Sequence, residues 1–169
     1  QAECCNYDEG ASRSFTNTLS FRWDVLPGFF INGTGTIVTS RERTEKFISP
    51  ESNEFKDVAN RSEQGSLSIN NIRRLSYEGK FVVNYAKNLG EDYLLTLHGG
   101  FDISKKTQTM DGYTAYGFYK SSLHAPNFAA GFGEGRRPTG TDDIETSVGP
   151  FINANFIMKN RYFVDGSFR

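Results

Sequence analysis

Strict alternation of apolar and polar residues over Arg74 to Ser104 is the feature that most constrains the fold of this chain. Two alternating runs lie on either side of a polar break at Lys87 to Asp92. Side chains of a β-strand point to opposite faces with a period of two, so each run predicts a strand with one apolar and one polar face. Together the runs predict a hairpin whose apolar surface needs a neighbour, either a protein core or lipid.

The two faces of this hairpin take alternate residues. The apolar face combines Leu75, Tyr77, Gly79, Phe81, Val83 and Tyr85 with Tyr93, Leu95, Leu97, Gly99, Phe101 and Ile103. The opposite face carries the charged or titratable residues Glu78, Lys80, His98 and Asp102, with Val82 as an apolar exception.

The same period of two recurs along the rest of the chain. Strands are expected near residues 14–24, 29–39, 67–86, 93–104, 151–158 and 161–169. Aromatic residues make up 14% of the chain and there are 17 glycines, a composition that favours strands and turns over helices. The sequence therefore predicts an all-β, antiparallel up-and-down meander of about six strands, a single segment over residues 1–169.

The connections between these strands alternate in length. Three are short, at Pro27-Gly28, 87–92 and 159–160, and two are long, at 40–66 and 105–150. An outer-membrane barrel has its short turns on the periplasmic side and its long loops outside, whereas a Greek-key sandwich has no reason to follow that order. The third strand is also about twice the usual length of a strand in a soluble protein. Both features predict part of a larger transmembrane β-barrel.

Aromatic residues flank the short turns, namely Trp23, Phe29, Tyr85, Tyr93 and Tyr162. Folding the strands places them at one height, and amphipathic rings prefer the headgroup level of a membrane. The pattern therefore predicts a membrane-interface girdle, with ordinary cross-strand aromatic packing as the alternative. On the girdle interpretation the hairpin faces lipid through Leu75, Tyr77, Phe81, Val83, Leu95, Leu97 and Phe101.

One aromatic stretch in the second long connection is a candidate contact site. It contains Tyr113, Tyr116, Phe118 and Tyr119. Exposed aromatics on an outer loop can stack on a sugar or anchor a partner protein. Packing of loop against loop over a barrel mouth is the alternative.

Several other classes of function find no support in the sequence. The net charge is −1 and the basic residues are scattered, so nucleic-acid binding is not expected. No run of apolar residues is long enough for a transmembrane helix. His98 and His124 lack metal-ligand spacing, so neither a metal site nor a cofactor is expected. The neighbours Cys4 and Cys5 could form a vicinal disulfide, pair with another chain or stay free.

No catalytic residues are predicted either. Asp142, Asp143 and Glu145 lie close together, but acidic residues in a loop rich in Gly and Thr are usually solvated surface. His98 has no Ser or Cys nucleophile pattern beside it, so we expect a hydrogen-bonded wall residue. The sequence does not predict an enzyme.

Two segments, Arg74 to Ser104 and Phe151 to Arg169, resemble the barrel of the SusC/RagA family, the TonB-linked outer-membrane transporters of Bacteroidetes. Asn155 to Phe163 matches that family's tyrosine-bearing strand, Lys-Asn turn and Arg-Tyr strand. The hairpin at 14–40 and the loop at 126–150 are also similar to family elements. The family motif Arg-x-Asp-Gly-Ser-Ser is expected directly after Arg169, because Asp165-Gly166-Ser167 falls inside a strand.

The resemblance implies part of a TonB-dependent receptor that imports glycan (oligosaccharide) or peptide nutrients across a Gram-negative outer membrane. This segment would form barrel wall and extracellular loops. The implied partners are outer-membrane lipid, a SusD-like surface lipoprotein, and TonB acting through a plug domain that the chain lacks.

About six strands cannot close a barrel of roughly twenty-two, so we expect a longer polypeptide. Alone, the segment would associate through its open edges and its uncovered apolar face. A soluble secreted β-sandwich used for binding or adhesion, with the apolar faces forming its core, is the alternative.

Overall fold

The computed structural model describes residues 6–133 and 136–169. Cys4, Cys5 and two residues of the glycine-rich segment at 131–135 therefore lie outside the described residues. The strands are β1 (Tyr7–Leu26), β2 (Phe29–Ile48), β3 (Ser66–Asn88), β4 (Tyr93–Tyr116), β5 (Thr139–Met158) and β6 (Tyr162–Phe168). Three single-turn 3-10 helices are η1 (Asn53–Phe55), η2 (Arg61–Glu63) and η3 (Pro126–Phe128). None of the helices in the described ranges is long and apolar enough to span a membrane.

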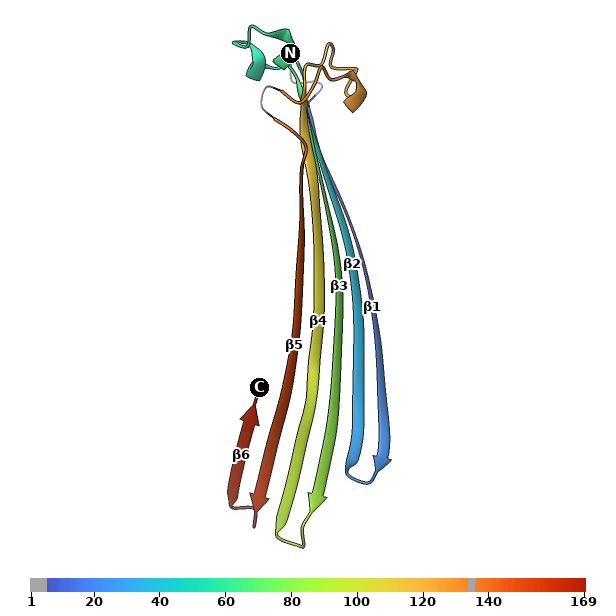
Figure 1. The fold of residues 1–169 in the computed structure, drawn as a ribbon, viewed down its shortest axis with the longest axis vertical. Coiled ribbons are helices and arrows are strands. Elements are labelled where there is room, and N and C mark those ends of the chain that lie inside the picture. Colours follow the sequence, from blue (N-terminus) through green and yellow to red (C-terminus); the bar gives the residue numbers. More distant parts are fainter. Residues whose placement is uncertain (1–5, 134–135) are drawn as a thin grey trace. The chain divides into compact units, whose positions relative to one another are not determined.

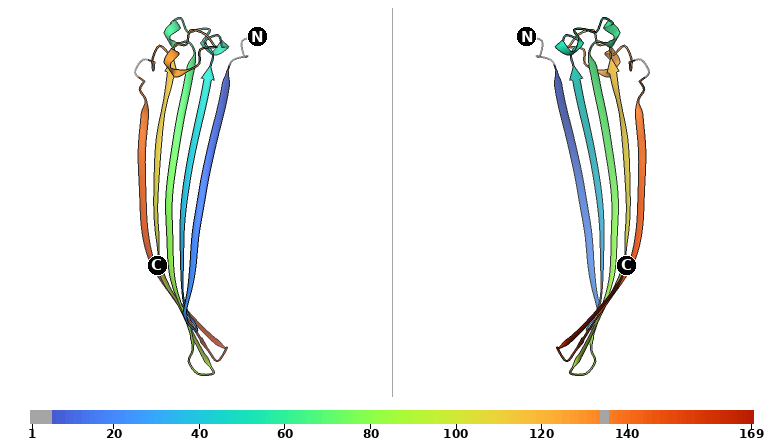
Figure 2. Two further views of the ribbon diagram at one scale, coloured as in Figure 1. Left: turned by 90° about the vertical axis from the view of Figure 1, so that its right-hand side faces the viewer. Right: turned by 90° about the vertical axis from the view of Figure 1, so that its left-hand side faces the viewer.

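The six strands form one sheet whose order is the order of the sequence, β1 to β6 (Figure 1). Each strand lies beside its sequence neighbours, as two further views also show (Figure 2). The predicted all-β, antiparallel meander is confirmed. The described residues contain no second sheet to pack on this one, as a β-sandwich would require.

The strands are longer, and the long connections shorter, than the sequence predicts. β2 continues to Ile48, β4 continues to Tyr116 and β5 begins at Thr139, so the expected loops at 40–66 and 105–150 shrink to 49–65 and 117–138. Residues 41–46 of β2 are polar on both faces, so the period of two that marks a strand is lost there. Ion pairs support this extension, including one of 2.6 Å between Arg74 and Glu42.

The chain divides into two compact units, and five of its strands, β1 to β5, have residues in both. Unit 1 contains residues 1–15, 39–74 and 108–143, and unit 2 contains residues 16–38, 75–107 and 144–169. Both long connections belong to unit 1, whereas all three short turns belong to unit 2.

Unit 1 has a small hydrophobic core, whose buried members are Phe47, Leu67, Ile69, Ala115 and Phe118. The rings of Phe47 and Phe118 meet edge to face with centroids 5.2 Å apart. The two long connections are also joined by backbone hydrogen bonds, because the N–H of Phe118 donates to the carbonyl of Gln64 at 3.0 Å. The core therefore holds the second connection against the ends of β2, β3 and β4, and this hydrogen bond joins it to the first connection.

Tyr7 packs on this core and donates a hydrogen bond of 2.6 Å from its hydroxyl to Glu45. Burial, together with that hydrogen bond, raises the pKa of Tyr7, and the same hydrogen bond lowers the pKa of Glu45. The pair ties β1 to β2 within unit 1.

The turns of unit 2 use left-handed backbone where the hairpins need it. Gly28 has φ +78°, and Lys159 and Asn160 both have φ +52°. Two successive positive φ values match the right-handed twist of the flanking strands. The short turn predicted at 159–160 spans 159–161, because Met158 pairs with Tyr162, and its geometry keeps β5 and β6 in register.

We predict that Phe47→Ala loosens both long connections together. The cavity should lower the free energy of local opening in unit 1 by about 3–5 kcal/mol. Hydrogen–deuterium exchange of amides at 49–65 and 117–133 measures this opening. Phe128→Ala is the control, because Phe128 is partly exposed and its loss should cost only about 1 kcal/mol. Unchanged exchange in Phe47→Ala would contradict a shared core.

Candidate functional site

Unit 2 has one apolar and one polar face, and side-chain contacts establish which residues share each. Phe81 stacks on Phe101 with centroids 5.6 Å apart, so the apolar positions of β3 and β4 lie on the same face. Phe29 extends this face to β2 through its contact with Tyr85 at 6.3 Å. The apolar residues predicted for the two strands of the central hairpin thus lie on one continuous surface.

The register of β5 and β6 continues both faces. Ile152 pairs with Phe168, Phe156 with Val164 and Met158 with Tyr162, whereas the intervening pairs are Asn153 with Ser167 and Asn155 with Asp165. Tyr93 of β4 stacks on Phe156 at 5.9 Å, which joins the apolar pairs to the surface described above. We call this surface of unit 2 the apolar face.

Large hydrophobic side chains on the apolar face are exposed. Leu19 is 73% exposed and Phe101 46% exposed. Tyr77 is similarly exposed, while Leu75, Phe81, Val83, Leu95 and Leu97 are half-buried by their neighbours. Ile144 and Val148 also belong to this face and are exposed, but sequence reasoning placed them in a loop. An apolar surface of this extent is not the outside of an ordinary soluble monomer.

The five predicted girdle residues all lie in unit 2, each within a few residues of a short turn. Trp23 and Tyr162 are more than half exposed. Phe29 and Tyr85 contact each other, and Tyr93 contacts Phe156, so cross-strand packing contributes at three of the five positions. Their role at a membrane interface stays a prediction.

The opposite, polar face is held by side-chain hydrogen bonds. Thr18 bonds Thr36 at 3.1 Å, and Ser104 bonds Ser147 at 3.0 Å. These contacts link β1 with β2 and β4 with β5.

His98 lies on this polar face and bonds Asn84, which is buried to 7% exposure. His98 is thus a hydrogen-bonded residue of the sheet wall, as expected. The ammonium of Lys80 lies 5.5 Å from the centre of the Phe151 ring, so this aromatic residue of the polar face makes a cation–π contact.

The four aromatics of the candidate contact site do not form one platform. Phe118 is 1% exposed in the unit 1 core, so the prediction that it contacts a ligand is wrong. Its side chain fills the space between the two long connections. Tyr113 also packs on that core and meets Phe132 edge to face at 5.8 Å. Loop packing, the alternative interpretation, therefore accounts for these two residues.

Tyr116 and Tyr119 remain accessible. Tyr119 is 65% exposed, with the guanidinium of Arg61 5.1 Å from its ring. The hydroxyl of Tyr116 accepts a hydrogen bond from Arg136, whose guanidinium also lies 5.1 Å from the Tyr116 ring. Each ring is thus paired with a cation, which leaves part of its surface for a further contact.

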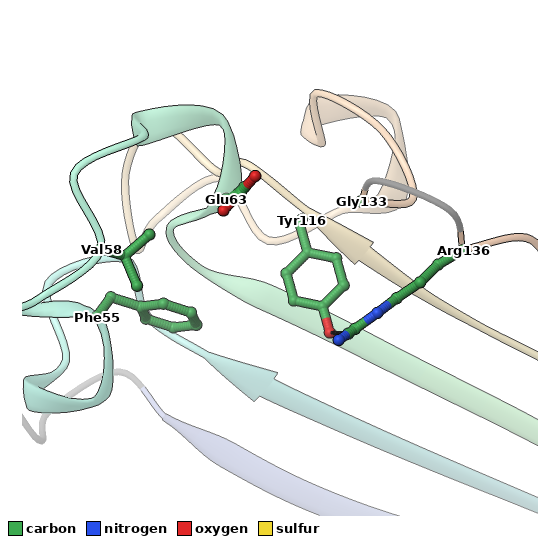
Figure 3. Close-up of a pocket in the computed structure, with 6 residues that line it drawn as sticks. All are labelled: Phe55, Val58, Glu63, Tyr116, Gly133 and Arg136. Carbon is green, nitrogen blue, oxygen red and sulfur yellow. Dashed lines mark hydrogen bonds between the residues drawn. The ribbon is translucent and has the colours of Figure 1, made fainter.

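Tyr116 forms the centre of a pocket of about 350 Å³ in unit 1 (Figure 3). Phe55 and Val58 form an apolar side, while Glu63 and Arg136 bring one negative and one positive charge. The pocket can thus receive an apolar group together with charged or polar groups. Sequence reasoning found only Tyr116, because the other residues come from two connections that no local pattern links.

The acidic residues Asp142, Asp143 and Glu145 lie on β5, not in a loop, and all are exposed. No group of three or more His, Cys, Asp or Glu residues gathers into a metal site within the described part of the chain.

Comparison with known proteins gives similarity at the level of the fold. No family model matches the chain, and no curated protein matches it. The solved structure of the RagAB peptide transporter matches with a TM-score of 0.85 at 15% identity, covering 96% of this chain and 18% of the transporter chain. The RagAB peptide importer in its closed-closed state matches with a TM-score of 0.84 at 14% identity, over 96% and 18%.

The open-open state of the same importer gives a TM-score of 0.84 at 14% identity, over 96% of this chain and 17% of the importer chain. The chain therefore spans less than a fifth of the length of the transporter chains that it resembles in fold.

Proposed function

We propose that this chain is a wall segment, with its external loops, of a SusC/RagA-type TonB-dependent transporter in the outer membrane of a Gram-negative bacterium. The longer protein to which it belongs is called the parent below. The parent imports a nutrient, and the segment contributes no catalysis.

The observation that carries this proposal is the apolar face of unit 2, set against a hydrogen-bonded polar face on the same strands. A barrel wall in a membrane needs this alternation, because one face meets lipid and the other a polar interior. Leu75, Tyr77, Phe81, Val83, Leu95, Leu97 and Phe101 would then face lipid, with Trp23, Phe29, Tyr85, Tyr93 and Tyr162 at the interface.

The placement of the connections supports the same orientation. All three short turns belong to unit 2 and both long connections to unit 1. In outer-membrane barrels the short turns are periplasmic and the long loops extracellular. Unit 1 would then lie outside the cell, and its pocket would be open to extracellular ligands.

The substrate we propose is a peptide, because the similar structures are of a peptide transporter and a peptide importer. The pocket around Tyr116 supports this choice, since an apolar wall with Glu63 and Arg136 offers contacts to a side chain and to both peptide charges. Oligosaccharide remains the second substrate class, for which stacking on Tyr116 or Tyr119 would be the main contact.

The partners follow from the same assignment. A SusD-like surface lipoprotein would cover the external loops, with the exposed ring of Tyr119 available for contact. TonB would supply energy through a plug domain elsewhere in the parent.

We predict that Phe81→Arg impairs membrane assembly of the parent while Glu78→Arg is mild. An arginine at mid-membrane on the lipid side costs roughly 2–4 kcal/mol, whereas the interior face tolerates charge. Heat-modifiable migration and yield in the outer-membrane fraction measure assembly. Phe163→Arg makes the same residue change on the polar face and is the matched control. If the parent fractionates as a soluble protein without detergent, the proposed function is wrong.

The orientation predicts which cysteine variants are labelled in intact cells. In a background with Cys4 and Cys5 changed to Ser, Lys56→Cys in the first long connection should react with a membrane-impermeant maleimide. Glu91→Cys in a short turn should react only after the outer membrane is permeabilised. Both side chains are exposed, so a difference reports location and not burial. Equal labelling of the two, or the reverse order, contradicts the orientation.

A further inference from the structure

The apolar face of unit 2 contains a groove of about 570 Å³ that crosses β1 to β4. Leu19, Ile37, Tyr77 and Ile103 line it, and Gly35 and Gly79 leave gaps where side chains would otherwise stand. The side chains that line the groove are thus mainly apolar.

Gly35 shows that the gap is open space and not a packing requirement. A Cβ added there would meet no atom within 4 Å, and its backbone φ is not in the left-handed region. Gly79 differs, since its added Cβ would come within 3.0 Å of Ile103. A larger residue at position 35 would therefore fill the groove without disturbing the sheet.

Four polar residues also line the groove. Thr36 and Glu78 occupy positions that alternate to the polar face, whereas Asn17 and Lys105 are in the phase of the apolar face. The positions of β4 that point to the apolar face are the odd-numbered ones. From Tyr93 to Ile103 these positions are all uncharged, and the next of them is Lys105. Lys105 is exposed, and none of the salt bridges among the described residues involves it. Its ammonium is thus available to meet an anion beside the groove.

We propose that this groove binds an acyl chain of an anionic phospholipid, with Lys105 pairing with the phosphate of a headgroup that carries no cation of its own. The inference rests on the proposed function, because only a face exposed to a membrane meets such a lipid. An apolar groove favours an acyl chain, and a lysine near the membrane surface attracts an anionic headgroup.

Native mass spectrometry of the detergent-purified parent tests the site. The probes are phosphatidylglycerol and phosphatidylcholine with identical acyl chains, titrated separately. The wild type should bind phosphatidylglycerol roughly fivefold more tightly. Lys105→Gln should remove that preference, and Gly35→Leu should abolish the saturable binding of both lipids.

Two control variants make the result specific to the groove. Lys106→Gln removes the same charge from the adjacent, opposite-facing position, and Gly99→Leu adds the same side chain on the apolar face outside the groove. Both should bind lipid as the wild type does. Equal affinity for the two lipids, or wild-type binding by Gly35→Leu, overturns the inference.

Other outcomes separate this inference from the function on which it rests. If Gly35→Leu converts a dimer into a monomer while lipid binding is unchanged, the groove holds a second copy and the lipid assignment is wrong. If the parent resists alkaline extraction from membranes but shows no groove-dependent lipid, only this inference fails. If it is extracted as a soluble protein, the proposed function fails as well.

Discussion

The structure depends on one constraint, which is that the side chains of each strand alternate between two surroundings of opposite polarity. In unit 2, contacts such as Phe81 with Phe101 and Ser104 with Ser147 put apolar and polar residues on separate faces of the same sheet. A shift of one residue between neighbouring strands would exchange these faces. The turns at Gly28 and at Lys159-Asn160 hold the register and so preserve the separation.

Unit 1 follows a different principle, because its long connections bury side chains of their own. Phe118 of the second connection packs on Phe47 at the end of β2 and donates a backbone hydrogen bond to Gln64 of the first, and Tyr7 adds a hydrogen bond to Glu45. This packing leaves Tyr116 and Arg136 at a pocket while Phe118 is removed from contact with any ligand. The same aromatic-rich stretch thus supplies both buried residues that stabilise unit 1 and accessible residues that can contact a ligand.

The sequence was sufficient for the fold class and for the faces of the central hairpin, because period-two alternation there is nearly unbroken. It was not sufficient for the strand ends. Residues such as Glu42 and Arg43 are polar on both faces of β2, and Ile144 and Val148 follow an acidic stretch that looked like a loop. The pocket around Tyr116 could not be predicted either, since Phe55, Glu63 and Arg136 meet only through tertiary packing.

The central claim is that the apolar face of unit 2 lies against lipid and the polar face does not. Spin labels placed one at a time at residues 95–102 of β4, in the parent reconstituted into bilayers, measure this directly through collision with oxygen and with a water-soluble nickel complex. The account predicts that oxygen dominates at positions 95, 97 and 101 and nickel at 96, 98 and 102. Absence of this period of two, or nickel dominating at every position, would contradict it.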